Sequence, residues 1–161
     1  MIKRLIVGGV AVLAVGGSIW GVSGQDHTKR NTAGTVVTAG QLGVFVMHLG
    51  DCFSSIPNGT TRVSTLESVP CTSPHHWQDV YKGTLSDLTF DDKILRSESR
   101  ALCISQITSL AKKWNQTIAH EYATAQGNDL TPTVESWAKG DRTVDCVLGN
   151  ETISYTDSVM P

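Results

Sequence analysis

The longest apolar stretch of the chain lies at its N-terminus, where residues 5–22 carry no charge and follow Lys3 and Arg4. A helix of that length spans about 27 Å, close to the hydrocarbon thickness of a bilayer. Positive charge before such a run holds the N-terminus inside and sends the remainder across. Residues 1–24 are therefore predicted to be either a transmembrane signal anchor or a signal peptide cleaved before Gln25, and the length favours the anchor.

A polar segment separates this run from the body of the chain. Residues 25–40 contain no large apolar side chain beyond Val36 and Val37 and read as a flexible linker. Residues 41–161 are left as one domain outside the cytoplasm, of ordinary domain size.

Short apolar or alternating runs predict β-strands in the body, because side chains in a strand point alternately to the two faces. Asn58-Gly59 is a strong hairpin-turn signal between the first two of them. In the third run, the alternation places Trp77 and Tyr81 on one face. The predicted strands are residues 42–49, 61–66, 77–83 and 143–148, with 151–155 as a candidate hairpin partner of the last.

One segment, residues 92–115, has the 3.6-residue period of an amphipathic helix. The preceding Phe90-Asp91-Asp92 offers an N-cap and acidic residues for the first turn. Residues 118–126 are a candidate second, shorter helix. The inward positions of the main helix are Leu95, Leu102, Cys103, Ile107, Leu110, Ala111 and Trp114.

Cys103 therefore points toward the core and is one of four cysteines, with Cys52, Cys71 and Cys146. Four cysteines in an exported domain imply two disulfides with three possible connectivities. Local pairing, which we favour, joins Cys52 to Cys71 and Cys103 to Cys146. The predicted fold is α+β: a small disulfide-bridged antiparallel sheet packed on one main helix, preceded by the transmembrane or signal segment.

The charge of the body excludes two classes of partner. Without Lys3 and Arg4, it keeps 11 of the 13 basic residues against 15 acidic residues. Nucleic-acid binding depends on neutralising phosphates with clustered Lys and Arg, which this chain lacks. A basic membrane-surface patch is missing for the same reason. The membrane is expected as a partner only through the N-terminal helix.

Several motifs occur in an order that resembles the septum-formation domain family of actinobacteria, whose members often follow one transmembrane helix. The resemblance covers roughly residues 42–150 and implies an exported or anchored domain connected with septation, without an established catalytic activity. The motifs are Val46-x-x-Leu49-Gly50-Asp51-Cys52-Phe53, Val69-Pro70-Cys71-x-x-Pro74-His75, the helical Cys103, and Pro132-x-x-x-x-Trp137-x-x-Gly140-Asp141-Arg142-x-Val144-x-Cys146.

Four residues are candidates for a functional surface: His75, Trp137, Asp141 and Arg142. His75 could act in catalysis or bind a metal with a carboxylate such as Asp79 or Asp51. It could equally be a structural histidine beside the Cys71 bridge. An exposed Trp137 would suggest a platform for a glycan or peptide, and Asp141-Arg142 could be a binding pair or a turn held by side-chain bonds.

The sequence contains none of the nucleophile motifs of common hydrolases, and we assign no catalytic residue, cofactor or metal site. The leading interpretation is a non-enzymatic, single-pass membrane protein of the cell envelope, associated with septation and with envelope or division proteins as partners. One alternative is an envelope hydrolase or metal-dependent enzyme that uses His75. Another is a secreted ligand-binding domain.

Overall fold

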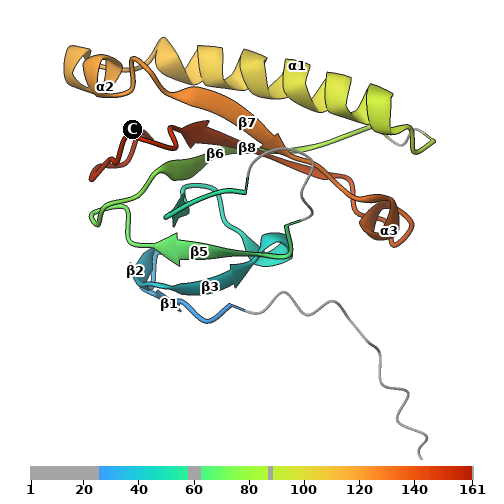
Figure 1. The fold of residues 1–161 in the computed structure, drawn as a ribbon, viewed down its shortest axis with the longest axis horizontal. Helices are drawn as coiled ribbons and strands as arrows, with labels where there is room; N and C mark the ends of the chain where they lie inside the picture. The colour runs from blue at the N-terminus through green and yellow to red at the C-terminus, as the bar shows by residue number, and fades with distance from the viewer. Residues whose placement is uncertain (1–25, 58–62, 87–88, 161) are drawn as a thin grey trace, which may run out of the picture.

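A computed structural model describes residues 26–57, 63–86 and 89–160. The chain forms a two-stranded sheet, a six-stranded sheet and three α-helices in these residues (Figure 1). In chain order the elements are β1 Lys29–Arg30, β2 Val36–Thr38, β3 Gly40–Gly43, the 3-10 helix Val44–Val46, β4 Cys52–Phe53, β5 Thr65–Val69, β6 Trp77–Thr84, α1 Asp92–Ala111, α2 Gln116–Glu121, β7 Gln126–Leu130, α3 Val134–Trp137 and β8 Thr143–Gly149.

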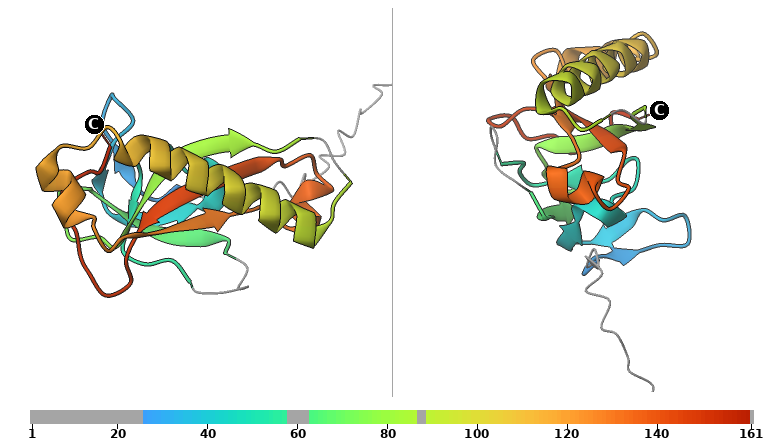
Figure 2. Two further views of the ribbon diagram at one scale, coloured as in Figure 1. Left: turned by 90° about the horizontal axis from the view of Figure 1, so that it is seen from above. Right: turned by 90° about the vertical axis from the view of Figure 1, so that its right-hand side faces the viewer.

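The six-stranded sheet has the order β3-β5-β4-β6-β8-β7, and all its pairings are antiparallel. Helix α1 lies across the end of the sheet that contains β6, β8 and β7 (Figure 2). The other end of the same sheet, with β4, β5 and β3, lies farther from the helix (Figure 1). The predicted α+β class, with an antiparallel sheet on one main helix and two disulfides, is therefore confirmed.

Helix α1 begins where the sequence predicts it. The Asp91 carboxylate accepts hydrogen bonds from the backbone N–H groups of Lys93 and Ile94 at 2.9 and 3.0 Å, which satisfies two donors that the helix leaves free. Its buried residues are Leu95, Ser99 and Cys103. The inward direction predicted for Cys103 is correct, since its side chain is 3% exposed.

Strand β6 departs from simple alternation. Its pairing with β8 shifts register between Asp79 and Tyr81, where Val80 is an extra residue. Beyond a bulge of this kind, side chains point to the opposite side of the sheet from the one that simple alternation predicts. Trp77 accordingly packs beside Phe53 in one core cluster, whereas Tyr81 packs against another. The expectation that Trp77 and Tyr81 share a face is wrong.

Four other elements differ from the expectation. The apolar run 42–49 is a strand only as far as Gly43, because a 3-10 helix follows it. Residues 151–155 form no strand; Tyr155 alone bridges His75. Strand β7 and helix α3 were not predicted, since β7 has a polar sequence rich in turn-forming residues and α3 is only four residues long. The Asn58-Gly59 turn lies outside the described residues.

Residues 26–40 are not the structureless linker that their composition suggests. They contain the β1–β2 hairpin, and the Arg30 guanidinium forms two hydrogen bonds with the Asp51 carboxylate, at 2.7 and 2.8 Å. Val36 is buried. A bidentate ion pair with a carboxylate that is itself buried explains why so polar a segment is held against the domain.

Replacement of Arg30 by methionine should therefore lower the free energy of unfolding by about 2 kcal/mol, because the buried Asp51 carboxylate loses its charged partner. Urea denaturation of the purified domain measures this change. The exposed Lys29→Met is the matched control and should leave stability unchanged. Equal stability of the two variants would show that Arg30 does not hold the hairpin.

Among the described residues, no helix combines the length and the apolar character that a membrane crossing requires. The segment 1–24, for which an anchor or signal peptide is predicted, lies outside that part of the chain.

Candidate functional site

The Cys52–Cys71 disulfide joins the start of β4 to the turn after β5 and borders an open groove. Cys52 is fully buried, whereas Cys71 is half-buried. Both sulfur atoms approach the carbonyl oxygen of Gly50, at 3.9 Å from Cys52 and 3.3 Å from Cys71. Gly50 adopts a φ of 94°, a conformation that glycine tolerates best, so the turn before the bridge requires it.

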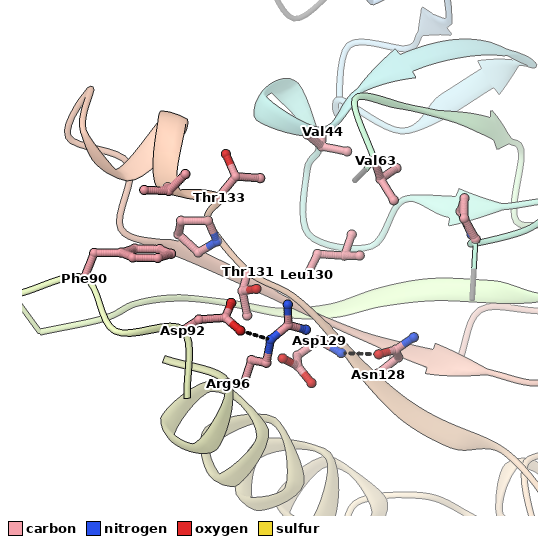
Figure 3. Close-up of a pocket in the computed structure, with 13 residues that line it drawn as sticks. Val44, Val63, Phe90, Asp92, Arg96, Asn128, Asp129, Leu130, Thr131 and Thr133 are labelled. Atoms are coloured by element: carbon pink, nitrogen blue, oxygen red, sulfur yellow. Dashed lines mark hydrogen bonds and ion pairs between the residues drawn. The ribbon is translucent and has the colours of Figure 1, made fainter. Parts of the chain in front are cut away.

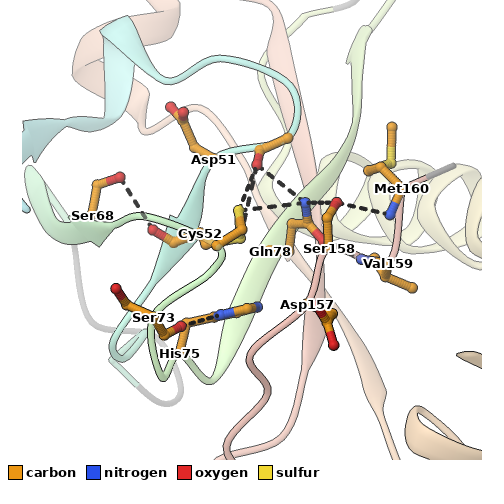
Figure 4. The surroundings of a disulfide bond; sticks show 12 residues. Asp51, Cys52, Ser68, Ser73, His75, Gln78, Asp157, Ser158, Val159 and Met160 are labelled. Atoms are coloured by element: carbon orange, nitrogen blue, oxygen red, sulfur yellow. Dashed lines mark hydrogen bonds between the residues drawn. A yellow bond between two sulfur atoms is a disulfide. The ribbon is translucent and has the colours of Figure 1, made fainter. Parts of the chain in front are cut away.

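The buried amide of Gln78 connects this bridge to the C-terminal segment (Figure 4). Its Nε2 donates to the Gly50 carbonyl at 3.1 Å and to the Ser158 hydroxyl at 2.8 Å. Its Oε1 accepts from the backbone N–H of Val159 at 2.8 Å, and Val159 is fully buried. One side chain of β6 therefore holds both the Gly50 turn and the end of the chain.

His75 is buried, with 1% of its surface exposed. Its Nδ1 lies 2.9 Å from the Ser73 carbonyl, so Nδ1 carries the proton and donates it. Its ring lies 6.2 Å from that of Tyr155. Burial lowers the pKa of His75, although the negative Glu121 and Asp157 oppose this shift. His75 is thus a neutral, enclosed side chain.

The predicted Trp137-to-Arg142 turn folds into a compact unit. The Arg142 guanidinium stacks 3.7 Å above the Trp137 ring and donates to the Trp137 and Asp141 carbonyls, each at 2.9 Å. The Asp141 carboxylate accepts the Thr143 N–H at 2.9 Å. Trp137 is 7% exposed and meets the edge of Phe90, so its ring faces the core and not a glycan or peptide.

The candidate residues therefore fall into two groups. Trp137, Asp141 and Arg142 lie together beside the core cluster under α1, and His75 packs by Tyr155 near α2. The carboxylates considered as partners of His75 are engaged elsewhere: Asp51 binds Arg30, and Asp79 faces the side chain of Asp145.

A buried acid pair was not anticipated from the sequence. Asp79 on β6 is 0% exposed, Asp145 on the neighbouring β8 is 6% exposed, and the Lys82 ammonium lies 2.6 Å from Asp145. Burial, together with the negative charge of Asp145, raises the pKa of Asp79 to about 9, although Lys82 opposes this shift. Asp79 is therefore protonated at neutral pH. The signal in the sequence was one aspartate within each of two predicted strands, of which only β8 is buried along nearly its whole length.

A second groove lies at the end of β7 (Figure 3), with a volume of about 440 Å³. Arg96 reaches into it from α1, in a 2.9 Å ion pair with Asp92. Asp129 on β7 faces it; burial raises the pKa of this carboxyl, while Arg100 and Arg96 counteract the shift. The opposite wall is apolar and includes Val44 and Leu130. This groove combines donors, acceptors and apolar contacts.

Within the described residues, no group of three or more His, Cys, Asp or Glu side chains is placed to hold a metal ion. The two disulfides instead set the class of protein: a small α+β domain that folds in an oxidising compartment, exported or secreted from the cytoplasm. A family model described as septum formation matches residues 20–146, so the chain belongs to the septum-formation family. Searches of the curated proteins and of the solved structures each returned no significant match.

Proposed function

We propose that the protein is a non-enzymatic component of septation, held at the cell membrane by residues 1–24 with its domain outside the cytoplasm. The observation that carries the proposal is the family match over residues 20–146 in a chain whose domain has two disulfides. The apolar run behind Lys3 and Arg4 supports the anchor, because its length suits a bilayer crossing.

The surroundings of the polar candidates argue against a catalytic role for them. The Nδ1 of His75 is committed to a backbone carbonyl, and its ring is enclosed. Asp141 and Arg142 bond to the backbone of their own turn. A catalytic acid or base needs access to the substrate proton that it transfers, and these side chains instead hold the fold.

The groove of Figure 3 is the surface that we propose for envelope or division proteins. The exposed Val134, 48% accessible, is one of its lining residues, and Arg96 and Asp129 line it as well. A mixture of apolar contact with a few directed polar groups is typical of protein interfaces.

A fluorescent fusion of the full chain should concentrate at division sites, and the protein should stay in the membrane fraction after carbonate washing. The matched control replaces residues 1–24 with a cleavable signal peptide; this form should be exported and released. Uniform cytoplasmic fluorescence would refute the proposal. An authentic mature protein that begins at Gln25 would refute the anchor and favour the secreted ligand-binding alternative.

A further inference from the structure

The groove beside the Cys52–Cys71 disulfide is larger than the groove at β7, at about 810 Å³. Its walls come from the β1–β2 hairpin, the turn at Gly50, the turn that contains Cys71, and the C-terminal segment. Two large apolar side chains that line it are open to solvent: Val37 is 51% exposed and Leu49 is 53% exposed. A disulfide and an exposed apolar surface therefore share one depression.

The second disulfide has a different setting. Cys103 and Cys146 are 3% and 0% exposed, and both belong to the core cluster that packs α1 on the sheet. Cys103 borders a smaller depression of about 390 Å³ between α1 and β7, but neither residue of this bridge is more than 3% exposed. The more enclosed bridge is therefore a built-in control for the reactivity of the other.

We propose that the Cys52–Cys71 bridge is a thiol–disulfide exchange site, and that the groove seats the dithiol segment of an extracytoplasmic oxidoreductase. Exchange proceeds by attack of a thiolate on one sulfur of a disulfide, so the rate depends on access to that sulfur. Both cysteines line the groove, and Cys71 is the half-buried residue of the pair whereas Cys52 is 0% exposed, so Cys71 is the side from which attack is expected. Val37 and Leu49 offer the apolar contact that a protein partner requires and a small thiol does not.

The chemistry balances with the partner dithiol as the reductant. Its first thiolate bonds to Cys71 Sγ, the bond between the two sulfurs of the bridge breaks, and the electron pair leaves on Cys52. The second partner thiolate then attacks the first partner sulfur, which forms the partner disulfide and releases Cys71 as a thiolate. The two protons lost by the partner thiols end on Cys52 and Cys71. In the oxidising direction, the same steps run in reverse.

The contacts of Gln78 connect this exchange to the rest of the domain. Its Nε2 lies 3.8 Å from Cys71 Sγ and also holds Gly50 and Ser158. Opening the bridge removes the covalent constraint on the Cys71 turn, next to the side chain that fixes the C-terminal segment. The inference depends on the location of the domain outside the cytoplasm but not on septation, so the localisation experiment and the following tests can fail separately.

The first test is graded reduction of the purified full chain in detergent with dithiothreitol, followed by alkylation and peptide mapping. The Cys52–Cys71 bridge should open at an about tenfold lower concentration than the Cys103–Cys146 bridge, because Cys71 is half-buried at the groove whereas Cys103 and Cys146 are 3% and 0% exposed. Opening of both bridges together, or of the core bridge first, would overturn the proposal. Far-UV circular dichroism at each step verifies that the protein remains folded.

The second test uses a thioredoxin-fold protein whose Cys-x-x-Cys motif is changed to Cys-x-x-Ser, so that a mixed disulfide accumulates. The cross-link should map to Cys71. Leu49→Asp should slow this capture about tenfold and leave reduction by dithiothreitol unchanged, whereas Ile94→Asp, at an exposed apolar site on α1, should change neither. A cross-link at another cysteine would overturn the exchange site. Equal rates of capture for the two variants would overturn the proposal that the groove binds the partner.

Discussion

Replacement of Asp79 by asparagine is expected to make the protein more stable than the wild type above neutral pH, and to remove most of the fall in its stability between pH 7 and pH 9. Asparagine has nearly the same shape as a protonated aspartic acid and keeps a donor toward Asp145. It cannot ionise. The change therefore tests whether the Asp79 carboxyl is neutral in the folded protein.

The sign follows from the two states of the group. Burial raises the pKa of Asp79 to about 9 in the folded protein, while an exposed aspartate in the unfolded chain titrates near 3.9. Between these values, the folded state binds a proton that the unfolded state lacks. The free energy of unfolding consequently decreases as pH rises, by up to about 1.4 kcal/mol per pH unit. Asp145, whose pKa burial also raises, contributes in the same direction.

Urea denaturation of wild type and Asp79→Asn at pH 7, 8 and 9 measures the effect. His75 does not contribute to the pH dependence of stability in this range, because burial lowers its pKa and the imidazole is neutral in both the folded and the unfolded state above neutral pH. Asp92→Asn changes a carboxyl on the exposed surface of α1 and should keep the wild-type slope. A variant at Asp79 that is less stable than the wild type throughout would mean that the buried carboxylate is charged.

The elements that could be predicted from the sequence are those in which a local pattern agrees with the tertiary environment. Helix α1 has an N-cap at Asp91 and an apolar face of 3.6-residue period. Strands β6 and β8 are uninterrupted runs of eight and seven residues whose sequences favour a strand. The disulfides follow the local pairing that we favoured, because Cys103 on the inward face of the helix meets Cys146 on the strand beneath it.

The remaining elements depend on contacts between distant residues. Strand β7 has the polar sequence Gln126–Leu130 and is a strand because β8 pairs with its whole length. The β1–β2 hairpin looks like a linker until Arg30 meets Asp51, 21 residues away. In each case the tertiary partner overrides a weak local preference.

In the candidate site, too, some features could be predicted from the sequence and others depend on contacts between distant residues. The Cys71 turn and its histidine were visible as residues of interest, yet their burial and the proton position on His75 depend on Ser73 and Tyr155. The Asp79–Asp145 pair was missed because a single aspartate in a strand normally indicates an exposed face. Only the strand register and the bulge bring both carboxylates inside.

Removal of the core disulfide, by the double change Cys103→Ala and Cys146→Ala, should lower the free energy of unfolding by about 4 kcal/mol. The bridge closes a separation of 43 residues, so its loss releases a long loop of the unfolded chain. The paired change at Cys52 and Cys71, whose separation is 19 residues, should cost about 3 kcal/mol. Since small domains have net stabilities of about 5–15 kcal/mol, either loss is severe.

Urea denaturation at neutral pH under non-reducing conditions measures both double variants. Their denaturant dependence should be steeper than that of the wild type, because an unfolded chain without the cross-link exposes more surface. Loss of the core bridge should also loosen α1, since Cys103 ties its inward face to β8, and amide hydrogen exchange should rise along Asp92–Ala111. A core double variant as stable as the wild type would show that side-chain packing alone holds the helix to the sheet, and that the bridge serves another purpose.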